Sequence, residues 1–226
     1  MPSVFITGCN RGIGLEFAHQ FAAAGWRVHA ACRQPASASA LKAIAGEVRV
    51  HALDIADDGQ IAAVASALGG EPLDLLINNA GLRQPNDDLG SIDVGAWLNL
   101  FRVNSIAPLR LAEALLPGLE RGARKLIVSI TSKMGSIADN GSGGSYAYRS
   151  SKAALNMAMK SLAVDLQPRG FTVVVFHPGW VKTDMGGAGA PVATKDSVAG
   201  MRAKIAALTP ADNGGFFNFD GKTLPW

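Results

Sequence analysis

The chain has 226 residues, 48% of them hydrophobic, which is enough for one large α/β domain or two small ones with a sizeable core. Its 21 basic and 18 acidic residues leave a net charge of +3 without a run of either sign, which argues against nucleic acid as a partner because phosphate binders usually concentrate their basic residues. No apolar run approaches the roughly 18 residues that span a bilayer, and no export signal opens the chain. We therefore expect a cytoplasmic protein with no membrane partner and no bound metal.

Short apolar runs alternate with longer segments of helical periodicity, the pattern of β-α-β units on a parallel sheet. Strands are predicted at residues 2–7, 27–32, 47–53, 73–78, 124–131 and 171–177, with a weaker one at 215–218. Helices are predicted at residues 12–24, 37–45, 58–69, 92–120, 148–167 and 195–208. Two strands, 124–131 and 171–177, are apolar on both faces, as a sheet covered by helices on both sides requires. The sequence thus predicts a single α/β domain, residues 1–226, with a doubly wound parallel sheet of the Rossmann type. A glycine-dense stretch at 185–191 fits either a mobile flap or a plain surface loop.

The segment TGCNRGIG at residues 7–14 joins the first predicted strand to the first predicted helix. Glycines in such a turn let the backbone approach a pyrophosphate, which then lies at the positive end of the helix. Between an apolar strand and an amphipathic helix, the pattern favours a dinucleotide site over a tight turn with no ligand. The residues expected to line this site are Gly8, Asn10, Arg11, Gly12, Ile13 and Gly14.

The residues after the second strand indicate which cofactor is bound. Sheets that bind NAD carry an acidic residue there, which takes the ribose hydroxyls. Here Cys32 is followed by Arg33, whose planar fork of donors suits a 2′-phosphate. Arg11 in the glycine turn adds a second positive charge. Either arginine alone fits a solvated surface residue, but the pair favours NADPH over NADH.

Further motifs follow in an order that resembles the short-chain dehydrogenase/reductase family over nearly the whole chain. They are the glycine turn, Asp54, Asn78-Asn79-Ala80-Gly81, Asn104, Tyr148-x3-Lys152 and Pro178-Gly179-Trp180-Val181-x-Thr183. The stretches 148–156 and 216–221 resemble the carbonyl-reductase branch that contains the sniffer and C-factor proteins.

The resemblance implies a role for each matching position. Asp54 and Ile55 would hold the adenine. The cofactor would be lined by Asn78, Ala80 and Gly81, although this segment also fits an ordinary strand-ending turn. The nicotinamide end would be covered by Pro178, Gly179, Val181 and Thr183.

Carbonyl reduction needs a hydride at carbon and a proton at oxygen, so the protein must supply an acid. A tyrosine has a pKa of about 10, and lowering it to 7 takes about 4 kcal/mol of phenolate stabilisation. Lys152 lies one helical turn beyond Tyr148 and presents positive charge on the same face, whereas Tyr146 lacks this spacing. The resemblance implies that Lys152 also holds the nicotinamide ribose and that Asn104 holds a water linking Lys152 to solvent. Pro108 offers a purely structural explanation for a bend near Asn104.

A further donor must steady the developing oxyanion, and a hydroxyl at the carboxyl end of a strand is well placed for this. Ser132 directly follows the fifth strand and is the preferred candidate. Ser136 competes, because the spacing of 16 residues from Ser132 to Tyr148 exceeds that in many family members.

The substrate is expected at the carboxyl ends of the strands. An apolar wall of Met134, Trp180, Met185 and Leu82 would suit a flat or hydrophobic ketone, aldehyde or quinone, unless these residues pack only against one another. The Ser, Tyr, Lys and Asn set favours a working reductase, which also oxidises the alcohol in reverse. The C-factor likeness leaves a cofactor-binding signalling protein with incidental catalysis as the alternative.

Family members commonly form homodimers or homotetramers through their long helices. The helix predicted at 148–167 carries small and apolar residues that would serve as such an interface, unless they face the sheet instead. These residues are Ala153, Ala154, Met157, Ala158 and Leu162.

Overall fold

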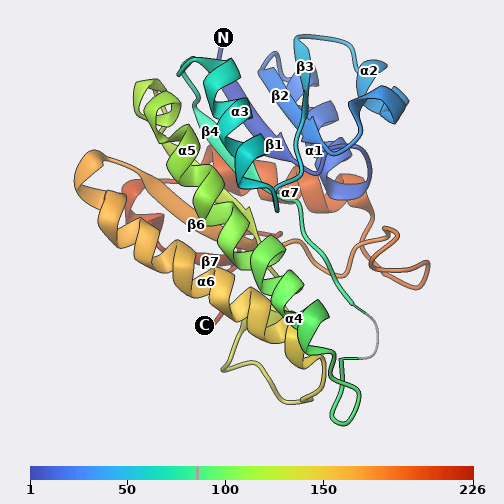
Figure 1. Ribbon diagram of the computed structural model, residues 1–226. Coiled ribbons are helices and arrows are strands. Elements are labelled where there is room, and N and C mark those ends of the chain that lie inside the picture. The colour runs from blue at the N-terminus through green and yellow to red at the C-terminus, as the bar shows by residue number, and fades with distance from the viewer. Residues whose placement is uncertain (85–86) are drawn as a thin grey trace.

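A computed structural model describes residues 1–84 and 87–226 and contains one parallel sheet of seven strands (Figure 1). Their order is β3-β2-β1-β4-β5-β6-β7. The chain builds the sheet outward from β1 to β3 and then returns to add β4 on the other side of β1, so the strand order reverses between β1 and β4. The doubly wound fold and all seven predicted strands are confirmed. The strands are β1 (Ser3–Thr7), β2 (Arg27–Cys32), β3 (Val48–Ala52), β4 (Leu75–Asn78), β5 (Leu126–Ile130), β6 (Thr172–His177) and β7 (Phe216–Asn218).

Helices cover both faces of this sheet, as the doubly apolar strands require (Figure 1). Side chains alternate along each strand, so Phe5 of β1 packs with α3 (Asp58–Leu68), α5 (Ala107–Arg121) and α6 (Tyr146–Leu166). Its neighbours Val4 and Ile6 face the opposite layer, which is formed by α1 (Gly12–Ala23) and α7 (Thr194–Ala206). Each fully buried side chain of this kind stabilises the fold by about 1.5–3 kcal/mol.

Three helical predictions need adjustment. Residues 37–45 form only a short helix, α2 (Ser39–Lys42), after a 3-10 turn. The stretch 92–120 divides into α4 (Val94–Phe101), a π-helical turn (Arg102–Ile106) and α5. α6 begins at Tyr146, two residues earlier than expected, because its N-terminal N–H groups find acceptors in another loop.

In the described part of the chain, no helix combines the length and the hydrophobicity needed to cross a membrane. The same residues contain no cluster of three or more potential metal ligands.

Candidate active site

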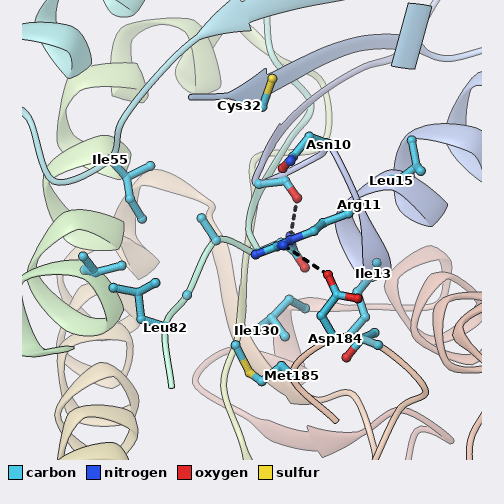
Figure 2. A pocket seen from close by; sticks show the side chains of 18 of the residues that line it. Asn10, Arg11, Ile13, Leu15, Cys32, Ile55, Leu82, Ile130, Asp184 and Met185 are labelled. Atoms are coloured by element: carbon cyan, nitrogen blue, oxygen red, sulfur yellow. Dashed lines mark hydrogen bonds and ion pairs between the residues drawn. The ribbon is translucent and has the colours of Figure 1, made fainter. Parts of the chain in front are cut away.

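A cavity of about 730 Å³ opens at the carboxyl ends of the strands, beside the point where the chain reverses between β1 and β4 (Figure 2). Most of the predicted cofactor residues line it, together with both members of the tyrosine and lysine pair. The lining residues among those predicted are Gly8, Asn10, Arg11, Gly12, Ile13, Gly14, Arg33, Asp54, Ile55, Ala80, Gly81, Tyr148, Lys152, Pro178 and Thr183.

The glycine turn has the geometry that close approach of a phosphate requires. Gly8 and Gly12 adopt φ of 71° and 57°, a left-handed conformation that glycine enters without strain. A Cβ on Gly14 would lie 2.3 Å from the Gly8 carbonyl oxygen, so no larger residue fits there. α1 begins at Gly12 with no side-chain cap and no acidic residue in its first turn. Its first N–H groups therefore suit an anion.

Asn79, to which the sequence assigns no role of its own, ties this turn to the loop after β4. Its side-chain amide donates to the Thr7 carbonyl (2.8 Å) and to the Gly8 carbonyl (3.3 Å). In return, Thr7 Oγ1 accepts the N–H groups of Asn79 and Ala80, each at 3.0 Å. Both loops are thereby fixed at one end of the cavity.

Three residues predicted to touch the cofactor do not line the cavity. Asn78 is buried beneath it, where its amide donates to Ser129 Oγ (3.2 Å) and to the Pro108 carbonyl (3.3 Å), so it joins neighbouring elements of the fold. Gly179 and Val181 shape the backbone of the following loop. Gly179 has φ of 86°, and Val181 forms an isolated bridge with Val192. Of the four residues of this motif predicted to cover the nicotinamide, only Pro178 and Thr183 line the cavity, together with Lys182.

The two arginines predicted to bind a 2′-phosphate have different surroundings. Arg33 is exposed on the cavity rim and has no carboxylate partner within residues 1–84 and 87–226. Arg11 forms an ion pair with Asp184, at 3.1 Å. Arg33 is therefore the free cation of the two, and the aspartate competes for Arg11.

Tyr148 lies on the cavity wall with only 8% of its surface exposed. Burial raises the pKa of its phenol, whereas a hydrogen bond with Ser132 and the charge of Arg83 act in the opposite direction. The competing Ser136 instead accepts the N–H of Asp139 at 3.1 Å. Ser132 likewise accepts a neighbouring backbone N–H, at 3.1 Å, but of the two serines only Ser132 acts on the pKa of Tyr148; it follows β5 as expected and does not itself line the cavity.

Lys152 is fully buried one turn along α6, and burial lowers the pKa of its ammonium to about 8. Its Nζ donates to the Ile130 carbonyl at 2.9 Å. The close approach of α6 to the loop after β5 depends on Gly135, where a Cβ would lie 2.9 Å from Lys152. The positive charge that opposes the rise in the Tyr148 pKa includes that of Arg83, a residue that the sequence does not single out.

Asn104 lies in the π-helical turn, a distortion that often marks functional sites. Its side chain is fully engaged, because Oδ1 accepts the Leu82 N–H (2.7 Å) while Nδ2 donates to the Leu82 carbonyl (2.9 Å) and to Ser151 Oγ (3.0 Å). The side chain therefore anchors the loop after β4, and the main-chain carbonyl offers a further acceptor for the predicted water. Pro108, four residues on, has no N–H to donate to that carbonyl.

The model of the short chain dehydrogenase family matches residues 2–191, which include all the elements described above except α7 and β7. The chain belongs to the short chain dehydrogenase family.

Similar proteins of this family agree with the branch expected from the sequence. The chain is 49% identical to the C-signal of Myxococcus xanthus over 155 residues, which cover 69% of this chain and 93% of that protein. Among solved structures, it is similar to the carbonyl reductase Sniffer of D. melanogaster (TM-score 0.92, 36% identity, 100% of both chains). It is also similar to an NADPH-bound carbonyl reductase from chicken fatty liver (TM-score 0.93, 36% identity, covering 100% of this chain and 99% of that one). The resemblance to the carbonyl-reductase branch is confirmed.

The wall expected to meet the substrate of this dehydrogenase is only partly assembled in the structure. Leu82 and Met185 line the cavity (Figure 2), but Met134 and Trp180 do not. Trp180 is 58% exposed and donates from Nε1 to the Gly186 carbonyl at 2.7 Å. This contact orients the indole along its own loop.

Two residues near Tyr148 escape the sequence analysis. The Arg83 guanidinium lies 5.7 Å from the centroid of the Tyr148 ring. Asp87 is buried and accepts the Tyr148 N–H at 2.9 Å. Both come shortly after the Asn78-Asn79-Ala80-Gly81 motif, which is the one sequence signal that could have drawn attention to them.

Proposed function

We propose that this protein is an NADPH-dependent carbonyl reductase that converts a ketone, aldehyde or quinone to the alcohol and runs the reverse oxidation when the alcohol is in excess. The observation that carries the proposal is the position of Tyr148, whose phenol interacts with the Ser132 hydroxyl, on the wall of a cavity that begins at the glycine turn. An acid beside a hydroxyl donor is what a carbonyl oxygen needs as it gains charge.

The residues present fit the dinucleotide. The uncapped N-terminus of α1 would take the pyrophosphate, and Gly14 would let the backbone come close to it. Arg33 would take the 2′-phosphate, since its guanidinium meets no competing carboxylate in the described part of the chain. When bound, the cofactor supplies the hydride.

In the reductive direction Tyr148 gives its proton to the carbonyl oxygen, and Ser132 Oγ donates a hydrogen bond to the same oxygen. Burial raises the pKa of Tyr148, so the phenol stays protonated at neutral pH, the state that a proton donor requires. Lys152 lies one turn away with a pKa of about 8, which suits a group that returns a proton to the site.

The variant Tyr148→Phe tests this assignment. It keeps the ring that packs in the wall and removes only the hydroxyl, so we expect NADPH affinity to stay within about threefold while turnover falls by roughly three orders of magnitude or more. Calorimetric NADPH titration and steady-state kinetics measure the two quantities. Retention of most of the carbonyl reductase activity would place the acid elsewhere.

The 49% identity to the C-signal favours a second candidate, a cofactor-binding signalling protein in which catalysis is incidental. A panel of quinones and aromatic ketones with NADPH separates the two functions. Turnover on any of them supports the reductase, whereas tight NADPH binding without turnover on the panel supports the signalling protein.

We also propose a homodimer or homotetramer. Met157 and Val164 on α6 are 67% and 60% exposed, which is consistent with a helical surface available to a second copy, whereas Leu162 packs into the core. Sedimentation velocity reports the mass directly.

A further inference from the structure

We propose that Arg83 forms an anion-binding subsite beside Tyr148, and that the preferred substrates are carbonyl compounds carrying a carboxylate within a few bonds of the carbonyl. This inference rests on the reductase function proposed above and adds a substrate class to it.

Arg83 places an uncompensated positive charge next to the proton donor. Its guanidinium carbon lies 5.7 Å from the centroid of the Tyr148 ring, and the residue is exposed. Within residues 1–84 and 87–226 it forms no ion pair with a carboxylate. The protein itself stabilises the charge of this guanidinium little beyond the contact with the Tyr148 ring.

Three other cations of the site are already engaged, whereas Arg33 and Lys182 line the cavity without a carboxylate partner in residues 1–84 and 87–226. Lys152 donates to the Ile130 carbonyl and Arg11 pairs with Asp184. Arg149 donates to the carbonyls of Gly143 and Gly144, each at 3.1 Å. Arg83 is distinguished from these cations because it lies over the Tyr148 ring and has no carboxylate partner in the described part of the chain.

The chain is anchored directly before Arg83. Asn104 holds the preceding residue, Leu82, through both its N–H and its carbonyl. Asp87 is held by the Tyr148 N–H, which donates to its carboxylate at 2.9 Å. The same tyrosine thus meets Asp87 at its backbone and Arg83 at its ring.

Substrate geometry follows from this arrangement. A carbonyl oxygen that accepts from Tyr148 must lie within about 3 Å of the phenol oxygen, so groups bonded near the carbonyl come close to whatever lies over the ring. The planar guanidinium fork matches a carboxylate with two parallel hydrogen bonds. A neutral ester of the same shape offers no charge and pairs less well.

The alternative is that Arg83 acts only through Tyr148, since a nearby cation favours the phenolate. These two roles make different predictions. An anion subsite discriminates between charged and neutral substrates, whereas an effect on Tyr148 alters turnover of both and moves the pH profile.

The test compares phenylglyoxylate with its neutral methyl ester, using NADPH and the full-length protein. We expect the wild type to favour the anion in kcat/KM. Arg83→Gln is expected to lower kcat/KM for the anion about tenfold or more, mainly through KM, with less than about twofold change for the ester; a shift in the pH profile through Tyr148 would be the same for both substrates and would leave their ratio unchanged. Arg83→Lys keeps the charge without the planar fork of donors. Its kcat/KM for the anion is expected to lie between those of the wild type and of Arg83→Gln. Arg110→Gln, which removes an exposed arginine that pairs with Asp58 and Glu113 on the outer surface of α5, serves as the control and leaves both substrates unchanged.

Equal losses on both substrates, or an unchanged ratio between them, would overturn the subsite while leaving the reductase function in place. Reduction of the ester or of a neutral quinone without reduction of the anion would do the same. If the wild type reduces neither substrate nor any of the quinones and ketones, the reductase function itself fails and this inference fails with it. Inhibition offers a separate readout: benzoate is expected to compete with the ester more strongly than benzamide does, and Arg83→Gln is expected to abolish that difference.

Discussion

Arg11 of the glycine turn and Asp184 of the loop after β6 form an ion pair, with 3.1 Å between Nη1 and Oδ2 (Figure 2). Both side chains are largely exposed, so the pair contributes little to stability. Its consequence is for the cofactor, because it places a carboxylate beside the arginine that the sequence assigns to a phosphate.

Cofactor preference should therefore depend more on Arg33 than on Arg11. We expect the wild type to prefer NADPH, and Arg33→Ala to reduce the ratio of kcat/KM for NADPH over NADH about tenfold or more, because a charge-assisted contact to phosphate is lost. Arg11→Ala should have a smaller effect, and Asp184→Asn should raise NADPH affinity by freeing Arg11. Steady-state kinetics with both cofactors measure these ratios. A wild type that prefers NADH would refute the assignment.

Gly14→Ala should block the cofactor site. The added methyl would lie 2.3 Å from the Gly8 carbonyl oxygen and 2.5 Å from Asn79 Nδ2, so the turn must move. We expect a loss of about 1–3 kcal/mol in unfolding free energy and a much weaker affinity for NADPH. Gly189→Ala is the matched control, since a Cβ there meets nothing within 4 Å. Thermal unfolding and NADPH titration of both variants check this, and equal behaviour of the two would contradict it.

Asp87 should position Tyr148 by capping α6 from another loop. Ser145, the residue before this helix, has φ of 50° and makes no side-chain cap, while Asp87 accepts the Tyr148 N–H. Asp87→Ala is expected to lower the free energy of unfolding by about 1–2 kcal/mol. It is also expected to lower kcat, even when kcat is measured at a temperature well below that of unfolding. Asp87→Asn keeps an acceptor oxygen and should restore most of both.

A second cap provides the control for this variant. Asp93 accepts the Ala96 N–H at the start of α4, so Asp93→Ala should lose comparable stability without the loss in kcat. If both variants lower kcat equally, the effect of Asp87 is structural and does not act on Tyr148.

Acid should destabilise the fold through His29. Burial lowers the pKa of this imidazole to about 4, with the charges of Arg27 and Arg49 and the neighbouring His51 acting in the same direction and Glu71 opposing them. The unfolded chain therefore binds more protons than the folded one between the ordinary value near 6.5 and 4. The contribution of His29 to the free energy of unfolding is therefore fully present above pH 6.5. It falls by up to about 3 kcal/mol as the pH decreases to 4.

Urea unfolding at pH 7.5 and pH 5.0 measures this loss. His29→Gln should be less stable at pH 7.5, because it disturbs the stacking with Phe5 and His51, but it should lose less stability on acidification. His19→Gln, at an exposed position, should show the acid loss of the wild type. An identical pH dependence in all three proteins would exclude His29 as the cause.

Local patterns in the sequence predict those features that depend on neighbours along the chain. Apolar runs predict the seven strands, and the glycines at 8, 12 and 14 predict the turn after β1, because both depend on backbone conformation over a few residues. The Tyr148 and Lys152 pair follows from helical spacing in the same way. Family resemblance adds the order of the remaining motifs.

Only the tertiary structure decides which side chains meet across the fold. It pairs Tyr148 with Ser132 in preference to Ser136, buries Asn78, and commits the Asn104 side chain to Leu82. It also brings Arg83 and Asp87 to Tyr148, across about 60 residues of sequence. Such contacts depend on how loops from different strands converge at one edge of the sheet, and no local periodicity encodes that convergence. The acid could therefore be chosen from the sequence by its spacing, whereas the charge beside it required the folded chain.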